Sequence, residues 1–177
     1  MTKLSLPTLV VLIAAASAGA QAPPVADSIA TRASVLFGHL SGRWSCAGGF
    51  ARGGPLEADL TFTSVADGRA LTFVHADRSP NIYRQSASWS LDDAGRIVSL
   101  AVAGSSKIRT GTASLFIATA WNESSLTLVA DTVKTPPFAP NQFTYSLTGG
   151  NDLKMVWEVT RNGSRAVGDS LLCRRVH

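Results

Sequence analysis

The stretch Leu40–Gly49, LSGRWSCAGG, places Trp44 two residues before Cys46, one of only two cysteines in a chain of 177 residues. The second cysteine, Cys173, lies near the other end, in LLCRRVH. If the two cysteines form a disulfide, their Cα atoms lie within about 7 Å of each other. The first and last strands must then be neighbours, and a sheet of consecutively paired strands closes into a barrel without free edges.

The two cysteines also predict the register of these strands. If Cys46 lies opposite Cys173 in an antiparallel pair, Trp44 lies opposite Arg175, and both pairs share one face. An arginine stacked on a tryptophan contributes about 0.5–2 kcal/mol. A disulfide that closes nearly the whole domain adds up to roughly 4 kcal/mol. The alternative is that both thiols stay unpaired or make external links.

Residues 1–22 have the pattern of a secretory signal peptide. Lys3 supplies a positive charge, Leu9–Ala16 form an apolar run, and Ala20-Gln21-Ala22 is an A-x-A cleavage site. The apolar run is too short to span a bilayer, and no other stretch has the required length. The high content of alanine and arginine and the form of the signal peptide indicate a bacterial protein. We therefore expect a periplasmic or secreted location, where two cysteines favour a disulfide.

The rest of the chain has the size of one domain. Residues 23–41 predict a linker and a helix, capped by Asp27 or Ser28 and ending near Leu40. Residues 42–177 predict the barrel. The formal net charge of +4 is spread over single arginines without a basic block, so nucleic-acid binding is not indicated.

Residues after the helix alternate between apolar and polar side chains, as in strands. The pattern is clearest in Leu56–Phe62, and turns recur at hairpin spacing. Residues 104–111 are less patterned, Thr135–Asn141 predict a proline-rich loop or lid, and Ser170–Arg175 predict the last strand. We count about eight to ten strands. Such a pattern is typical of a sandwich or a barrel, and the cysteines favour an all-β, up-and-down antiparallel barrel with one N-terminal helix.

A short helix, then Gly42-x-Trp44 on the first strand and an arginine on the last, resembles the calycin superfamily of lipocalin-like barrels. In that superfamily the tryptophan and arginine pack together at the closed end, which the resemblance implies for Trp44 and Arg175. Residues 157–163, 168–174 and 74–81 look closer still to uncharacterised secreted bacterial barrel proteins. These short motifs concern the fold and say little about chemistry.

The opening run of the first strand, Gly42-x-Trp44-x-Cys46-x-Gly48, also resembles the G-x-W-x-G-x-G opening of the nitrobindins. That family binds haem through a histidine on a late strand. The chain has only three histidines: His39 in the predicted helix, His75, and the final residue, His177. We therefore expect no haem and no other cofactor.

His75 and Asp77 share a face of one predicted strand, and a histidine oriented by a carboxylate can act as an acid or base. The same spacing is also typical of a structural hydrogen bond at a strand end. No zinc pattern, phosphate-binding loop or G-x-S-x-G motif accompanies the pair. We predict no metal site and assign no catalytic residue.

The candidate ligand-binding residues are side chains predicted to face the interior: His75, Tyr83, Gln85, Trp89, Tyr145 and Trp157. Aromatic walls with a few polar tips suit a small, mostly apolar ligand. The same residues also suit a core filled by its own side chains. Three functions stay open: ligand binding inside the barrel, catalysis by His75 and Asp77, and a non-catalytic role of the outer surface in the cell envelope.

Overall fold

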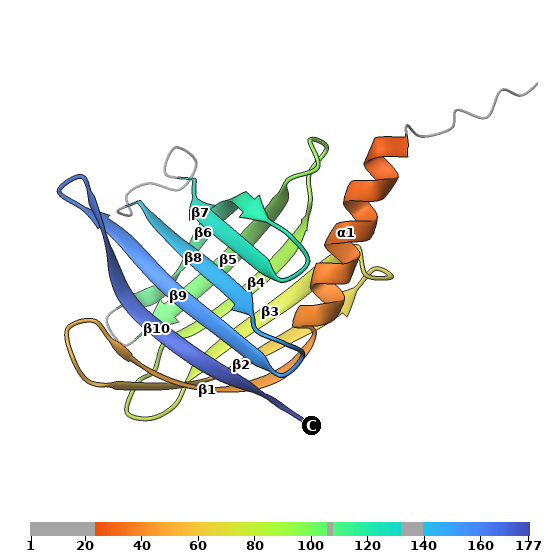
Figure 1. Cartoon of the computed structure of the whole chain (residues 1–177). Helices are drawn as coiled ribbons and strands as arrows, with labels where there is room; N and C mark the ends of the chain where they lie inside the picture. The colour runs from red at the N-terminus through yellow and green to blue at the C-terminus, as the bar shows by residue number, and fades with distance from the viewer. Residues whose placement is uncertain (1–23, 106–107, 132–139) are drawn as a thin grey trace, which may run out of the picture.

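In the computed structural model, which describes residues 24–105, 108–131 and 140–177, one helix is followed by ten antiparallel strands that close into a barrel (Figure 1). The elements are α1 (Pro24–Leu40), β1 (Gly42–Phe50), β2 (Pro55–Val65), β3 (Ala70–Asp77), β4 (Arg84–Leu91), β5 (Ile97–Ser105), β6 (Ile108–Trp121), β7 (Ser125–Ala130), β8 (Asn141–Leu147), β9 (Asp152–Arg161) and β10 (Ser164–Val176). Each strand pairs with the next, and β1 pairs with β10. The predicted fold class is therefore confirmed.

The strands β1 and β10 meet in the register that the cysteines predict. Cys46 lies opposite Cys173, and Trp44 lies opposite Arg175. The two sulfurs are at bonding distance, 2.07 Å, and the two Cα atoms are 3.9 Å apart. Such disulfides are typical of proteins in oxidising compartments. Within the residues that the structure describes, no helix is long and apolar enough to cross a membrane.

The structure corrects the predicted element bounds at several places. The helix α1 begins at Pro24, ahead of the predicted cap, because a proline in a first helical turn removes no needed hydrogen bond. The last strand, β10, begins at Ser164 rather than Ser170, since a bulge interrupts the alternation on which the prediction relied. Strands β5 and β6 extend into the less patterned residues 104–111. Of the predicted loop Thr135–Asn141, Asn141 begins β8, and residues 135–139 lie outside the described residues.

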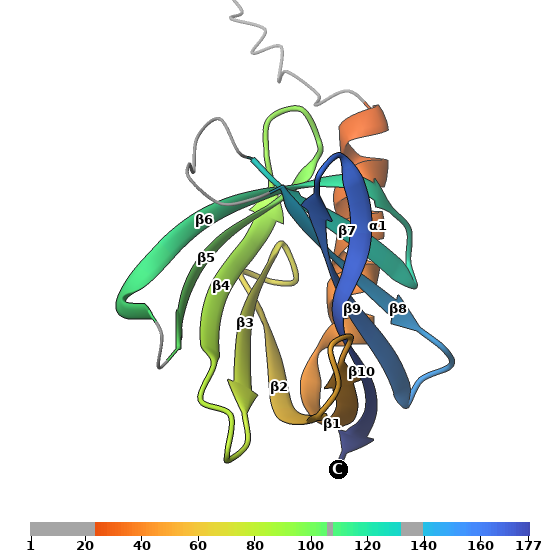
Figure 2. The ribbon, with the colours of Figure 1, turned by 90° about the vertical axis from the view of Figure 1, so that its left-hand side faces the viewer.

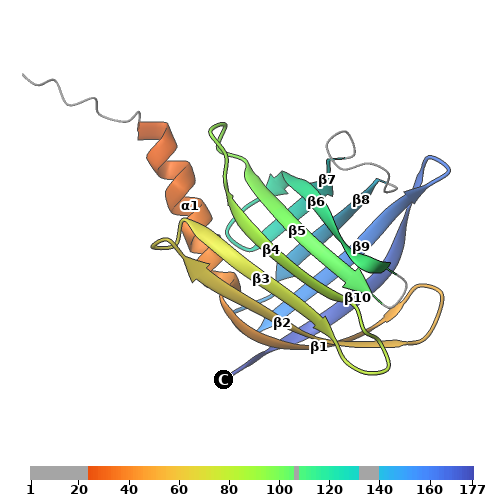
Figure 3. The same ribbon diagram turned by 180° about the vertical axis from the view of Figure 1, so that it is seen from behind.

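The helix α1 closes one end of the barrel. Its inward side chains join the barrel core; they are Ala33, Leu36, Phe37 and Leu40. The turns β2–β3 and β4–β5 approach the helix closely, since a Cβ added to Gly68 or Gly95 would meet Ser34 or Ile29. Figures 1 and 3 show α1 at this end and the β1–β2 and β9–β10 hairpins at the other. We call these the closed end and the open end.

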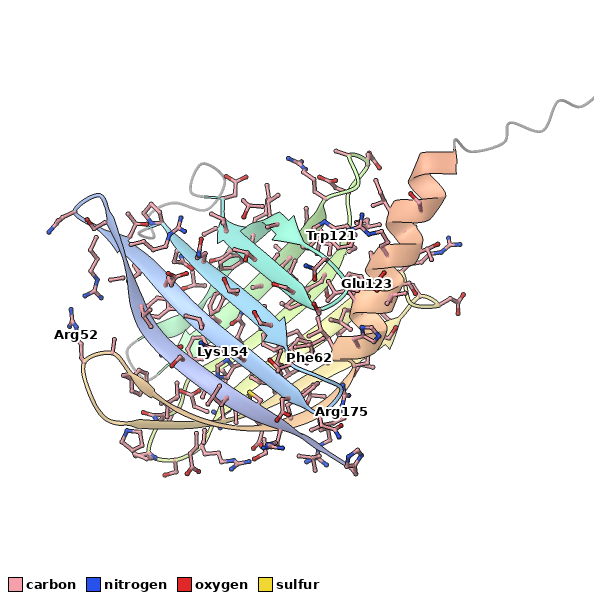
Figure 4. All side chains as sticks on the ribbon, viewed as in Figure 1. Arg52, Phe62, Trp121, Glu123, Lys154 and Arg175 are labelled. Carbon is pink, nitrogen blue, oxygen red and sulfur yellow. A yellow bond between two sulfur atoms is a disulfide. The ribbon has the colours of Figure 1, made fainter. Side chains whose placement is uncertain are left out.

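Trp44 and Arg175 join the closed end to the seam between β1 and β10. The Trp44 indole donates from Nε1 to the Leu40 carbonyl at 2.9 Å, and the Arg175 guanidinium carbon lies 4.2 Å from the indole centroid. Figure 4 shows Arg175 beside the end of the helix. Its guanidinium donates to three main-chain carbonyls, those of His39, Ser41 and Gly150. Arg175 therefore satisfies carbonyls that the end of a helix leaves without partners.

Candidate ligand cavity

The half of the barrel interior next to the closed end is filled by aromatic side chains. Four rings pack together there, with centroids of neighbouring rings 4.7–6.1 Å apart; they belong to Phe62, Phe73, Trp89 and Tyr145. Each of the four is no more than 2% exposed. Figure 4 shows Phe62 inside the barrel toward the helix end. These four side chains form an aromatic plug in that half.

The half next to the open end holds a cavity of about 710 Å³. Strands β3 to β6, which run side by side in Figure 2, form one wall of it. Its apolar lining consists of Phe50, Leu56, Pro80, Ile82, Ala101, Ala103, Phe116, Phe143, Met155 and Trp157. Its polar lining consists of His75, Asp77, Asn81, Tyr83, Gln85, Thr112, Ser114, Asn141 and Asp169. The interior is thus neither wholly filled nor wholly hollow.

The six predicted ligand-binding residues divide between these two halves. His75, Tyr83, Gln85 and Trp157 line the cavity. Trp89 and Tyr145 belong to the aromatic plug and are not among the lining residues. Alternation along a strand predicts which side chains face inward, but depth along the barrel axis depends on the stagger of the strands. The sequence pattern therefore could not separate plug from cavity.

Strands β3 and β4, with the residue directly before β4, place four polar side chains together at one wall. His75 and Asp77 are 4% and 5% exposed, and His75 Nε2 lies 2.8 Å from Asp77 Oδ1. On the neighbouring strand, Gln85 lies opposite His75, and its Oε1 accepts a hydrogen bond of 3.0 Å from the Tyr83 hydroxyl. The rings of His75 and Tyr83 are 5.3 Å apart. Burial raises the pKa of Tyr83, so its hydroxyl remains a donor at neutral pH.

Asp169 of β10 is a cavity residue that the sequence pattern did not indicate. A bulge between Val167 and Asp169 shifts the register against β9. At the bulge, Gly168 lies so close to Trp157 that an added Cβ would overlap the indole ring. Asp169 then faces inward with Leu171 and lines the cavity. The signal that could have found it is an isolated glycine in a strand, which often marks a bulge.

The surroundings of Asp169 favour its protonated form. Burial is the main cause that raises its pKa to about 6, and the Asp77 carboxylate adds to the rise, while His75 opposes it. The same burial raises the pKa of Tyr145 in the adjoining plug. Two buried atoms here have no hydrogen-bond partner among the described residues, Asp169 Oδ1 and His75 Nδ1. A buried polar group without a partner costs free energy unless something else satisfies it.

The His75–Asp77 pair has part of the geometry of an acid–base catalyst. In the described residues, however, no hydroxyl is hydrogen-bonded to His75 Nδ1, so the pair is not linked to a nucleophile. Catalysis by these residues stays a prediction. The described part of the chain also holds no group of three or more His, Cys, Asp or Glu residues arranged to bind a metal ion.

Comparisons with known proteins give little beyond this geometry. No family model matches the chain. No curated protein matches it either. Among solved structures it is similar to the structure of EF1p2_mFAP2b bound to DFHBI, with 12% identity and a TM-score of 0.41. That match covers 81% of this chain and 99% of the other chain. A similarity at this level carries no argument about function.

Proposed function

We propose that this protein is an exported, calycin-like barrel that binds a small, mostly apolar molecule in the open half of its interior. The observation that carries the proposal is the cavity of about 710 Å³ beside the aromatic plug. Pockets for small molecules measure roughly 300–1,000 Å³ and combine apolar walls with a few convergent polar groups. The lining here has both properties.

The rest of the fold supports a rigid binding site. The disulfide, the helix and the plug fix the strands from which the lining projects, so the cavity is formed before a ligand enters. Aromatic side chains from four different strands, Phe50, Phe116, Phe143 and Trp157, contribute flat apolar surfaces. Such preorganisation reduces the entropy lost on binding.

A titration with Nile red, an uncharged apolar dye, tests the proposal. We expect a saturable rise in fluorescence with one dye bound per protein, because the dye leaves water for the cavity. Ala103 lines the cavity on β5, so Ala103→Phe should fill it and weaken binding by roughly tenfold or more. The matched control is Val102→Phe, which adds the same ring to the neighbouring, outward-facing position, 51% exposed.

The outcomes separate the cavity from the surface. Loss of binding in Ala103→Phe with retention in Val102→Phe supports an interior site. No saturable signal, or equal loss in both variants, contradicts the proposal. Circular dichroism on each variant checks that the barrel is intact.

Export is a second part of the proposal, supported by the signal-like residues 1–22 and by the disulfide. When the full chain is produced in a bacterial host, we expect it in the periplasm with a mature N-terminus at Pro23. Intact-mass measurement should show the loss of residues 1–22, and a thiol reagent should find no free cysteine. A cytoplasmic protein that keeps its first residues would contradict this part.

A further inference from the structure

The charged groups in the described lining of the cavity have one dominant sign. Two carboxylates, Asp77 and Asp169, and one histidine, His75, line it, and the lining residues that the structure describes include no lysine or arginine. While Asp77 remains ionised, this cluster is neutral or negative whichever groups of His75 and Asp169 hold a proton. We call these three residues the acidic cluster.

The acidic cluster is incompletely satisfied by the protein itself. His75 is 4% exposed, and its Nδ1 has no hydrogen-bond partner among the described residues. Asp169 Oδ1 is also buried and has no partner in the described part of the chain. A carboxylate kept partly out of water is unfavourable unless a positive or hydrogen-donating group compensates it. Among the described residues no such group reaches this oxygen, which makes it a candidate partner for a donor group on a ligand.

We propose that the ligand is an amphiphilic amine, an apolar body that carries a protonated nitrogen bound at Asp169. This inference rests on the proposed function and names the ligand class of that same cavity. The N–H groups of an ammonium can donate to Asp169 Oδ1, which has no donor among the described residues, and the positive charge is attracted by the acidic cluster. A ligand carboxylate would instead place like charges close together in a site of low dielectric constant.

The aromatic lining suits the same ligand. Trp157 packs over Gly168, directly before Asp169, so an ammonium at Asp169 lies beside an indole. Aromatic rings attract cations through their faces. Phe143 and Phe116, whose ring centroids are 5.5 Å apart, supply apolar surface for the body of the ligand.

Three probes with one shared aromatic body test the charge preference in the unmodified protein. They are 1-naphthylmethylamine, the uncharged 1-naphthalenemethanol, and 1-naphthoic acid, and binding is measured by calorimetry at neutral pH. We expect the amine to bind most tightly and the acid at least about tenfold more weakly than the amine. The alcohol should lie between them, because it has the apolar body without the charge.

Removal of the Asp169 charge should reduce this preference. In Asp169→Asn, the ratio of amine to acid affinity should fall by at least about threefold. Asp152→Asn is the matched control, because Asp152 is a half-buried carboxylate paired with Arg174 outside the cavity. It should leave the ratio unchanged.

The pH dependence provides a readout that a purely structural role would not give. The titratable groups around Asp169 are His75, Asp77, Tyr83 and Tyr145. Both tyrosines stay protonated through neutral pH. Amine binding should strengthen as the pH rises through about 6, where Asp169 ionises. Binding of the alcohol should not show this rise.

The outcomes separate the amine inference from the proposed binding function. If the alcohol binds but the amine is no tighter than the acid, the amine inference is overturned while the binding cavity stands. If Asp152→Asn lowers the ratio as much as Asp169→Asn, the charge effect belongs to the surface and the inference is again overturned. If none of the probes binds, both the inference and the proposed function fail.

Discussion

Arg175 performs several tasks at once, and its position follows from the register of the two cysteines. Its guanidinium stacks on Trp44 and donates to carbonyls at the end of α1 and in the β8–β9 turn. A planar group with five donors can make these contacts together, whereas a lysine cannot. The sequence predicts the stacking, because Arg175 lies two residues after Cys173. It does not predict the three carbonyl partners, which depend on where the helix ends.

Arg175→Ala should lower the free energy of unfolding by about 2–4 kcal/mol, because the stacking and the charge-assisted hydrogen bonds are lost together. Arg175→Lys should recover only part of this loss. Arg174→Ala is the control, since Arg174 is 81% exposed in its side chain and forms one surface ion pair. It should cost less than about 0.5 kcal/mol. Urea unfolding measures all three, and equal effects at positions 174 and 175 would contradict the role of Arg175.

Asp169 is a residue whose cost to stability can be measured directly. Its pKa is about 6 in the folded protein and 3.8 as an ordinary value, so the folded state binds the proton more tightly than the unfolded chain. The contribution of Asp169 to stability therefore falls as the pH rises from about 4 through about 6. The sequence pattern gave no reason to expect this, because the bulge that turns Asp169 inward lies in the part of β10 that alternation missed.

Asp169→Asn should be more stable than the unmodified protein above pH 6, by roughly 1–3 kcal/mol. The difference should shrink to near zero below about pH 4, where the carboxyl group is neutral in both states. Urea unfolding at both pH values checks this. A variant that is less stable at high pH would show that the ionised Asp169 has partners that satisfy it.

At the scale of elements, β10 shows where alternation succeeds and where it fails. Its second part, from Leu171 to Arg175, keeps strict alternation with buried Leu171 and Cys173, and the sequence predicts it. Its first part, from Ser164, has no such pattern because it forms the exposed hairpin and the bulge. Strand β2 is the opposite case, since every second residue from Leu56 to Phe62 is buried and the prediction is confirmed.

Gly168→Ala should disturb this bulge. Its new Cβ would overlap the Trp157 ring, so we expect a loss of about 1–3 kcal/mol and a displaced indole. Gly104→Ala is the matched control in β5, because an added Cβ there meets nothing within 4 Å. It should change stability by less than about 0.5 kcal/mol. Thermal or urea unfolding and the Trp157 indole N–H resonance report the two effects, and an undisturbed Gly168→Ala variant would contradict the close packing.

At the scale of the whole molecule, two cysteines predict the closure of the barrel, but nothing in the pattern predicts how full the barrel is. The disulfide links residues 127 positions apart and lies on the seam of β1 and β10. Whether inward residues fill the interior depends on how the stagger of ten strands layers them. The stagger of the strands places Trp89 and Tyr145 in the plug and Trp157 in the cavity wall, although alternation predicts that all three side chains face inward.

The double variant Cys46→Ala/Cys173→Ala should have a free energy of unfolding about 2–5 kcal/mol lower than the unmodified protein. The reason is that the disulfide no longer constrains its unfolded chain. A reducing agent should destabilise the unmodified protein by a similar amount and leave the double variant unchanged. If unfolding in urea, which exposes both sulfurs, is unaffected by the reducing agent, the cysteines are not paired in solution.

The most direct test of a ligand cavity in the open half of the barrel uses the four tryptophans as internal probes. They lie in different places: Trp157 in the cavity wall, Trp89 in the plug, Trp44 at the seam, and Trp121 beneath Arg32 of α1. Nuclear magnetic resonance resolves their indole N–H signals during a titration with 1-naphthalenemethanol. If the probe binds in the open half, we expect a saturable shift of the Trp157 signal and little change in the other three signals. A Trp157 signal that does not move, or four signals that move alike, would contradict a ligand cavity at this place.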